Sequence, residues 1–187
     1  SSGKQGYEIA KSLSDNGFNT TLISGPVNLD SIKGVNLIKV RTADEMLEAT
    51  LNNLPTDVAI FSAAVGDFKV KNSKKEKIKK DKISELSLEK NTDILGHISN
   101  HNSLRPKLVV GFAAETNSLK KNSLKKLSEK NCDWIIANDI SKKNIGFESD
   151  FNKVSIYYKN KSEENLPKMK KSSLANEIVN RIISQLN

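Results

Sequence analysis

The sequence has too little cysteine for the disulfides that stabilise many secreted domains, and it lacks an apolar stretch long enough to cross a membrane. Its single cysteine, Cys132, excludes a disulfide within the chain, so we expect a reducing compartment. The longest apolar runs, such as residues 58–61, are far shorter than the roughly 20 residues that span a bilayer. No secretory signal pattern opens the sequence. We therefore predict a cytoplasmic protein with no membrane partner.

Arginine and aromatic residues are also scarce. Three of the 30 basic residues are arginine and aromatic residues make up 5% of the chain, although the formal net charge is +8. Proteins that read nucleic acids use arginine for bidentate contacts and aromatic rings for base stacking. The lysine excess fits an anionic small-molecule substrate, and we predict no nucleic-acid partner. A basic nucleic-acid-binding module is the alternative, and its binding would weaken steeply with salt.

Helical and strand signals alternate along the 187 residues, which are enough for one domain with a sizeable core. This alternation predicts an α/β fold of the Rossmann-like, three-layer type, with a mostly parallel central sheet and a late β extension. Expected helices cover residues 6–15, 93–100, 118–130 and 173–186, and another follows the capping box at 42–45. Expected strands cover residues 20–24, 35–40, 57–64, 108–114, 134–137 and 153–158.

Three segments carry more specific predictions. Residues 57–64 form a nearly continuous apolar run, which is typical of a strand buried on both faces. Residues 69–82 are rich in lysine and poor in apolar residues, which predicts an exposed, mobile loop. In the last helix, apolar residues recur at helical spacing and predict a buried stripe made of Leu174, Ile178, Ile182 and Leu186.

Ligands of such sheets bind beyond the carboxyl ends of the strands, and small residues gather at the expected strand ends. The first helix starts with Ser-Ser-Gly-Lys-Gln-Gly at 1–6, which offers free backbone N–H groups to an anion. An ordinary helix cap is the alternative interpretation of the same residues. The fingerprint G-x-G-x-x-G is absent, which weighs against an NAD(P)-dependent oxidoreductase, the second alternative function.

Two further turns and one helix hold candidate binding residues. Small side chains at residues 62–68 allow a ligand close to the backbone, and Asp67 is able to accept hydrogen bonds from a base or sugar or to help hold a metal ion. Phe112 follows the next strand and is placed to stack on a base. Lys126 and Lys130 are four residues apart and share one helix face. Each has a purely structural alternative. Asp67 would cap a tight turn, Phe112 would pack in the core, and Lys126 and Lys130 would lie on a solvated helix face.

The two histidines, His97 and His101, have the spacing of a helical metal pair. The sequence offers no evident third ligand, so we expect no zinc site and assign no metal ligands. Cys132 has no histidine nearby and is expected in the core.

Eight short motifs follow one another along the chain. They are Ser-Ser-Gly-Lys-x-Gly at 1–6, Ser-Gly-Pro at 24–26, Ala-Ala-Val-x-Asp at 63–67, Glu-Lys-Ile-Lys-Lys at 76–80, Lys-Asn-x-Asp at 90–93, Gly-Phe-Ala-Ala-Glu-Thr at 111–116, Ala-Asn-Asp-Ile-Ser at 137–141 and Gly-Phe-x-Ser-Asp at 146–150. Together and in this order they resemble the phosphopantothenate–cysteine ligases, also called phosphopantothenoylcysteine synthetases. In most bacteria this domain is the C-terminal half of a bifunctional coenzyme A biosynthesis protein. The resemblance implies that residues 1–187 are one CTP-binding synthetase domain that lacks its start.

The resemblance implies a ligase reaction in two steps. The carboxylate of 4′-phosphopantothenate attacks the α-phosphate of CTP, which gives an acyl-cytidylate and pyrophosphate. The amine of L-cysteine then attacks the acyl carbon, which gives phosphopantothenoylcysteine and CMP. Mg²⁺ is expected with CTP because it screens the phosphate charge that repels the attacking carboxylate. The residues alone leave the choice between CTP and ATP open.

The resemblance also implies roles for individual residues. Lys77 matches a flap lysine that contacts the nucleotide and supports activation, so it is the expected catalytic residue. Ala63 and Ala64 match a backbone turn that contacts phosphopantothenate. The residues expected to contact CTP are Ser2, Gly3, Ser62, Ala63, Asp67, Lys77, Lys90, Asn91, Thr92, Phe112, Lys126 and Lys130.

Partners are implied in the same way. Bacterial members of the family form dimers, so a homodimer is expected. A flavin-dependent decarboxylase, fused or separate, is the usual N-terminal neighbour, and we predict no flavin site in this chain. The family also has an asparagine just before the Ser-Ser-Gly motif, with a glycine-rich strand and an arginine farther upstream.

Overall fold

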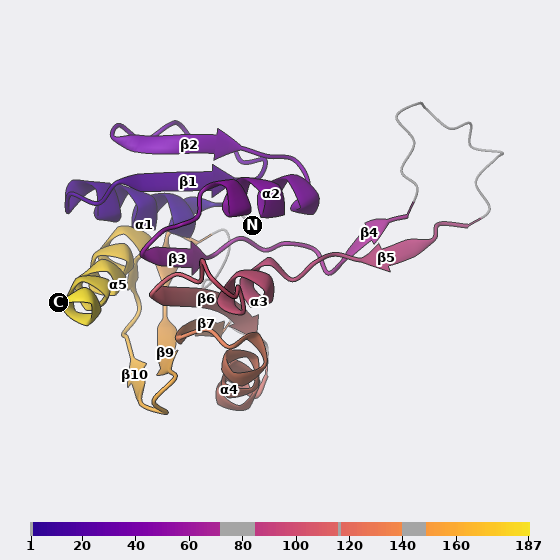
Figure 1. Cartoon of the computed structure of the whole chain (residues 1–187). Coiled ribbons are helices and arrows are strands. Elements are labelled where there is room, and N and C mark those ends of the chain that lie inside the picture. Colours follow the sequence, from indigo (N-terminus) through magenta and orange to yellow (C-terminus); the bar gives the residue numbers. More distant parts are fainter. Residues whose placement is uncertain (1, 72–84, 116, 140–148) are drawn as a thin grey trace.

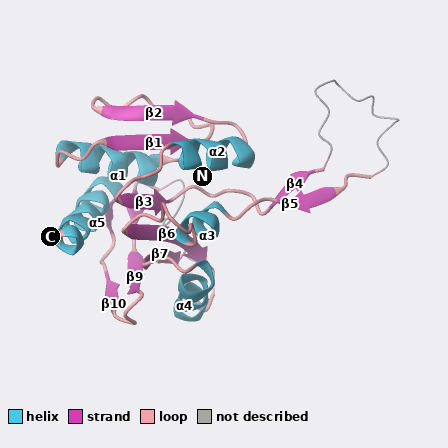
Figure 2. Cartoon of the chain, viewed as in Figure 1, coloured by secondary structure: helices cyan, strands magenta, loops and turns pink. Residues whose placement is uncertain are grey.

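The computed structural model describes residues 2–71, 85–115, 117–139 and 149–187 (Figure 1). The helices are α1 (Lys4–Asp15), α2 (Ala43–Asn52), α3 (Ile94–Ser99), α4 (Leu119–Lys130) and α5 (Lys171–Leu186). The strands are β1 (Thr20–Ser24), β2 (Val35–Lys39), β3 (Val58–Phe61), β4 (Phe68–Val70), β5 (Leu88–Lys90), β6 (Leu108–Glu115), β7 (Trp134–Asp139), β8 (Phe151–Asn152), β9 (Val154–Tyr158), β10 (Glu163–Asn165) and β11 (Met169–Lys170). The helices lie on both sides of the strands, as the α/β prediction requires (Figure 2).

The central sheet has five strands in the order β10-β9-β7-β6-β3. Strands β3, β6 and β7 are parallel, with Ile60 opposite Val110 and Phe112 opposite Ile136. Strands β9 and β10 continue the sheet in antiparallel pairing, which confirms the predicted late β extension. Strands β1 and β2 form a separate parallel pair, while β4–β5 and β8–β11 are antiparallel ribbons.

Two apolar cores lie on opposite faces of this sheet because successive residues of a strand point to opposite sides. Val110 and Ile136 belong to the core beneath α1 and α5, where Ile178 of the predicted helical stripe is fully buried. Val109 and Ile135 belong to the second core, which α3 and α4 cover. The helices and the sheet therefore form the three layers that the sequence predicts.

Strands β1 and β3 face each other across a gap. They point the same way (Figure 1), yet in the described residues β1 pairs only with β2, and β3 only with β6. The residues of β3 are half-buried, so the prediction that this apolar run is buried on both faces is wrong. The reason is that the free edge of β3 borders a cleft instead of another strand.

The prediction of a loop from residue 69 onward is also wrong at its start. Strand β4 pairs with β5 in a ribbon that projects away from the body of the protein (Figure 1). Lys69 in β4 is anchored to α2, because its Nζ atom lies 2.6 Å from Asp44 Oδ2. Residues 72–84, the rest of the predicted loop, lie outside the described residues. In the part of the chain that the structure describes, no helix combines the length and apolar content that a membrane crossing requires.

Candidate functional site

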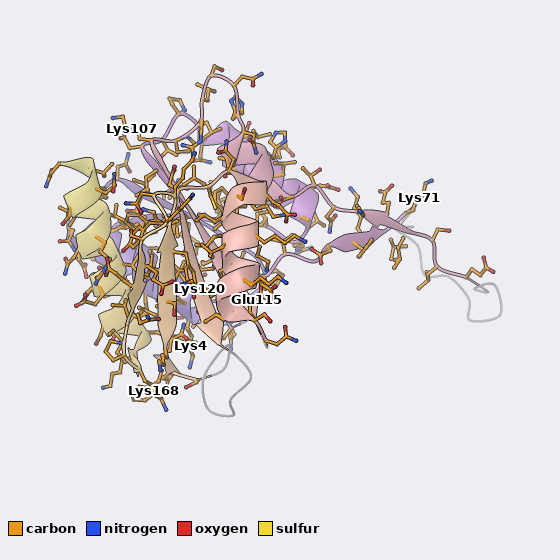
Figure 3. All side chains as sticks on the ribbon, turned by 90° about the horizontal axis from the view of Figure 1, so that it is seen from below. Lys4, Lys71, Lys107, Glu115, Lys120 and Lys168 are labelled. Atoms are coloured by element: carbon orange, nitrogen blue, oxygen red, sulfur yellow. The ribbon has the colours of Figure 1, made fainter. Side chains whose placement is uncertain are left out.

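Two clefts open near the ends of the strands. The large cleft, of about 950 Å³, follows the gap between β1 and β3 and extends to α3 and α4. The small cleft, of about 490 Å³, lies around the start of α1 and the ends of β1, β3 and β7. Figure 3 places Lys4 and Glu115 at the end toward which the parallel strands point, and Lys107 at the opposite end. The small cleft and the inner part of the large cleft thus lie where ligands of parallel sheets bind.

The turn at residues 62–68 joins the two clefts. Its first residue, Ser62, lines both, and so does Asn91. Asn91 secures the turn, because its Nδ2 donates to Gly66 O at 2.8 Å and its backbone N donates to Asp67 O at 2.9 Å. Asn91 Oδ1 is buried and has no hydrogen-bond partner among the described residues. A ligand that reached from one cleft to the other would pass this oxygen.

Two lysines of α4 line the large cleft, and each is paired with a carboxylate. Lys126 Nζ lies 2.7 Å from Glu115 Oε1 at the end of β6, and Lys130 Nζ lies 2.6 Å from Asp93 Oδ2 just before α3. Burial alone would raise the pKa of the Glu115 carboxyl, but hydrogen bonds from Lys126 and Asn122 outweigh it and leave that pKa below its usual value. The four-residue spacing therefore does place both ammonium groups on one wall.

The small cleft depends on a close approach of α1 to two turns. Gly3 precedes α1 with a φ of 74°, and a Cβ atom there would lie 2.9 Å from the side chain of Val27. A Cβ atom at Gly6 would lie 2.8 Å from Ser62 Oγ. Glycine at both positions lets the first turn of α1 reach the ends of β1 and β3. Gly3 has no side chain to cap the helix, and among the described residues no side-chain hydrogen bond caps it, so this helix start suits an anion.

The structure brings most of the predicted site residues together. Nine of them line the large cleft: Ser62, Ala63, Asp67, Lys90, Asn91, Thr92, Phe112, Lys126 and Lys130. Ser2, Gly3 and Ala64 line the small cleft and not the large one, so they are separated from the lysines of α4. Lys77, the predicted catalytic residue, lies outside the described residues.

The histidines and the cysteine do not form a reactive centre in the described structure. Within residues 2–71, 85–115, 117–139 and 149–187, no group of three His, Cys, Asp or Glu side chains is placed to hold a metal ion. His101 Nδ1 instead accepts a hydrogen bond from Leu104 N at 3.1 Å. Cys132 is fully buried, as predicted, and burial raises the pKa of its thiol to about 11. A buried cysteine with a raised pKa is a poor nucleophile.

Sequence reasoning missed several polar residues that line the small cleft, among them Gln5, Asn152 and Lys171. Asn152 and Lys171 are buried. Lys171 stands in a lysine-rich stretch that reads as solvent-exposed surface, so no sequence signal distinguishes it from its neighbour Lys170. Asn138, the second-last residue of β7, also lines the small cleft, as its place near a strand end suggests.

Comparisons with known proteins agree with this fold. The family model for the DNA/pantothenate metabolism flavoprotein C-terminal domain matches residues 1–186. The coenzyme A biosynthesis bifunctional protein CoaBC of Haemophilus influenzae is 41% identical over 188 residues, which cover 99% of this chain and 46% of that protein. The CoaBC protein of Borreliella burgdorferi is 42% identical over 183 residues, which cover 96% of this chain and 45% of that protein. The chain thus spans about half the length of these relatives.

Comparison with solved structures points to the same family of proteins. A crystal structure of the C-terminal domain of CoaBC has a TM-score of 0.80 and 34% sequence identity, and the match covers 100% of this chain and 84% of that chain. The DNA/pantothenate metabolism flavoprotein from Streptococcus pneumoniae has a TM-score of 0.79 at 19% identity, over 99% of this chain and 89% of that chain. The second likeness concerns the fold alone.

Proposed function

We propose that this chain, which belongs to the DNA/pantothenate metabolism flavoprotein C-terminal domain family, joins 4′-phosphopantothenate to L-cysteine and consumes CTP. The observation that carries the proposal is the meeting of two clefts at one turn, residues 62–68. The large cleft is lined by Lys126 and Lys130, and the small cleft is lined by the start of α1. Each cleft is therefore suited to an anion. The relatives named as coenzyme A biosynthesis bifunctional proteins support the same reaction.

The chemistry activates an acid for attack by an amine. A carboxylate oxygen attacks the α-phosphorus of CTP, the bond to pyrophosphate breaks, and an acyl-cytidylate forms. The cysteine amine then attacks the acyl carbon, CMP leaves with the bridging oxygen, and one proton is released. Because the acid and the nucleotide are both anions, the site needs fixed positive charge and backbone donors in place before they meet.

In this proposal CTP binds the end of the large cleft that the turn 62–68, α3 and α4 line, and not the gap between β1 and β3. Lys126 and Lys130 supply cationic charge along one wall, and Phe112 supplies an aromatic face for the base. The side chains that frame the nucleotide between these groups are Ser62, Asp67, Lys90, Asn91 and Thr92.

The small cleft binds the acid substrate. Ala63 and Ala64 have side chains small enough to let the carboxylate approach the backbone beside the nucleotide. Ser2 and Gly3 line the small cleft and not the large one, so we assign them to the acid instead of to CTP. Lys77 is proposed to contact the α-phosphate as charge develops on it.

The donor groups of the clefts fit a Mg²⁺ ion that arrives with the triphosphate. Asp67 and Asp93 line the large cleft, while no cage of three acidic or histidine side chains forms among the described residues. Mg²⁺ in nucleotide sites takes phosphate oxygens, waters and only one or two carboxylates. We propose Asp67 as the carboxylate that would hold it. When bound, the ion screens the phosphate charge against the attacking carboxylate.

Residues upstream of Ser1 in the full-length protein are proposed to complete the sheet. Among the described residues β1 pairs only with β2 and β3 only with β6, so each has an edge toward the cleft that an added parallel strand could pair with. An extended chain should unfold at a midpoint several degrees higher than the chain starting at Ser1. An unchanged midpoint would contradict the added strand.

A homodimer is proposed to form through the β4–β5 ribbon. Phe68 is 56% exposed, Leu86 64% and Leu88 60%, and a two-stranded ribbon is at best marginally stable alone. A second copy is the partner that the family resemblance implies. Phe68 also lines both clefts, which would link pairing of the ribbons to the site.

A flavin-dependent decarboxylase, fused or separate, is the other proposed partner. The curated relatives are named bifunctional proteins, and this chain spans about half of their length, which supports a second activity outside the chain. The flavin would belong to that partner.

A nucleotide panel tests the proposed function. Pyrophosphate release is measured in the full-length protein with CTP, ATP, GTP or UTP, with and without 4′-phosphopantothenate and L-cysteine. We expect release with CTP only when the acid is present, and CMP with the amide product only when cysteine is added. Pyrophosphate release at the same rate with and without 4′-phosphopantothenate would overturn the proposal. Salt-sensitive nucleic-acid binding with no turnover would favour the alternative of a nucleic-acid-binding module.

A further inference from the structure

Glu115 has the most deeply buried carboxylate among the ion pairs of the described residues. Its side chain is 13% accessible, whereas each of the other paired carboxylates keeps 21% or more. It is the last residue of β6, the strand that also carries Phe112, and Figure 3 shows it beside α4. A charged group taken out of water needs a compensating interaction, so the surroundings of Glu115 must supply one.

Both oxygens of the Glu115 carboxylate are held by side chains of α4. Oε1 lies 2.7 Å from Lys126 Nζ, and Oε2 accepts a hydrogen bond from Asn122 Nδ2 at 3.0 Å. Oε1 is buried, and among the described residues the Lys126 ammonium is the group that compensates its charge. Burial would raise the pKa of this carboxyl, yet the two contacts hold it below its usual value. Glu115 is therefore ionised at neutral pH.

The backbone on both sides of this ion pair is fixed. In β6, Ala114 lies opposite Asn138 of β7, so the strand is held in the sheet next to Glu115. In α4, Leu127 follows Lys126 and is buried in the core between the helix and the sheet. The lysine side chain itself is a flexible stem with a charge at its end. A carboxylate anchored on the sheet therefore sets where the Lys126 ammonium lies.

Lys126 is able to contact Glu115 and a ligand at the same time. Its side chain is 42% accessible and lines the large cleft. An ammonium group has several N–H donors, so one directed at Glu115 leaves others for a phosphate. If the ammonium left Glu115, the carboxylate would stay buried without its cation, which is costly. The ion pair should therefore persist when an anion binds in the cleft.

A carboxylate close to a phosphate site also carries a cost, because like charges repel. The arrangement is favourable where the gain from a cation that is already ordered exceeds this repulsion, since an unrestrained lysine loses rotamer freedom when it binds. The neighbouring pair on α4 shows the contrast. Lys125 Nζ lies 3.7 Å from Glu129 Oε1, both side chains are exposed, and neither residue lines a cleft.

We propose that Glu115 is a positioning residue for the reaction: it fixes the Lys126 ammonium where the phosphates of CTP bind, and it acts on the nucleotide only through that lysine. This inference rests on the proposed function of the large cleft. Glu115 itself lines neither cleft, so its effect on the nucleotide is indirect. Glu115→Gln keeps the size of the side chain and an oxygen for Asn122, and it removes the charge that holds Lys126.

The test is a double-mutant cycle in the full-length protein, with the wild type, Glu115→Gln, Lys126→Met and the double variant. Steady-state kinetics are measured against CTP with 4′-phosphopantothenate and L-cysteine saturating. We expect Glu115→Gln to raise the KM for CTP roughly 3- to 10-fold and to leave kcat within about twofold. In the Lys126→Met background the same change should raise the KM no further, because the lysine through which Glu115 acts is gone. Glu129→Gln is the matched control and should behave as the wild type.

The outcomes separate this inference from the proposed function. A rise in KM that is equal with and without Lys126 would overturn the role of Glu115, because it would reflect a general structural effect, and so would an unchanged KM in an active Glu115→Gln enzyme. If Glu115→Gln does not fold, Asn122→Ser, which frees the carboxylate to turn away from Lys126, goes through the same cycle with the same expectation. A wild type that makes no amide product from CTP, the acid and cysteine would overturn the proposed function itself, and this inference with it.

Discussion

Lys130 Nζ lies 2.6 Å from Asp93 Oδ2, so an ion pair ties the end of α4 to the residue that precedes α3. One turn earlier on α4, Lys126 makes the same kind of contact with Glu115 at 2.7 Å. Both lysines are partly exposed to the large cleft, with 32% and 42% of their side chains accessible. The carboxylates hold the cations in position before an anionic ligand arrives, which lowers the cost of ordering them.

Removal of the Lys130 cation should weaken nucleotide binding. For Lys130→Met we expect the KM for CTP to rise about 10-fold or more, because a charge-assisted contact to a phosphate is lost. The KM for 4′-phosphopantothenate should change little. Lys125→Met is the matched control, since Lys125 is exposed on the same helix and lines neither cleft. Equal effects of the two substitutions in steady-state kinetics would remove the proposed role.

The Glu115 carboxyl makes the stability of the fold depend on pH. Its pKa is lower in the folded chain than the usual 4.5, so its contribution to stability is present above that usual value and is lost as the pH falls through the folded pKa. The difference in thermal midpoint between wild type and Glu115→Gln should therefore shrink as the pH is lowered from about 6 to about 3. A difference that stays constant over this range would contradict the assignment.

Lys77 is expected to matter for turnover and not for folding. Lys77→Gln should lower kcat by about 100-fold or more, because under the proposal it removes the positive charge that stabilises the transferring cytidylyl phosphate. The thermal midpoint should remain that of the wild type. Lys71→Gln is the control, because Lys71 is an exposed lysine on the projecting ribbon (Figure 3). An unchanged kcat for Lys77→Gln would exclude a catalytic role.

The apolar side of the β4–β5 ribbon should control assembly. Leu88 faces Val70 across the ribbon and is 60% exposed, so Leu88→Glu places a charge in the proposed dimer contact. We expect sedimentation equilibrium to show a dimer for the wild type and a monomer for this variant. Leu104→Glu, at another exposed apolar residue away from the ribbon, should leave the dimer intact. A monomeric wild type would contradict the dimer proposal.

The fold could be predicted largely because its signals are local and periodic. Leu174, Ile178 and Ile182 recur at helical spacing, and all three are fully buried. The half-buried state of β3 could not be predicted, since apolar residues signal a strand but say nothing about which neighbours it will have. The ribbon could not be predicted because charged residues alternate with its apolar ones, Lys69 and Lys71 in and beside the first strand and Glu89 in the second, and lower the mean hydropathy.

The site was predictable only where residue type and spacing carry information. Asp67, Phe112 and Lys126 come from three separate segments, and they line one cleft as their places at strand ends and on one helix face suggested. Lys171 was not predictable, because its burial depends on how α5 meets α1 across more than 160 residues of sequence. Tertiary packing thus buries Lys171 in a cleft wall, although its sequence neighbourhood predicts an exposed side chain.

The transfer of oxygen from acid to nucleotide is the most direct test of the central claim. 4′-Phosphopantothenate labelled with ¹⁸O in its carboxylate is incubated with the full-length protein, CTP and L-cysteine, and the nucleotide product is analysed by mass spectrometry. Attack of the carboxylate on the α-phosphorus predicts one ¹⁸O atom in the phosphate of CMP. Unlabelled nucleotide with ¹⁸O in inorganic phosphate would mean attack on the terminal phosphate, and an acyl-cytidylate mechanism would then be excluded.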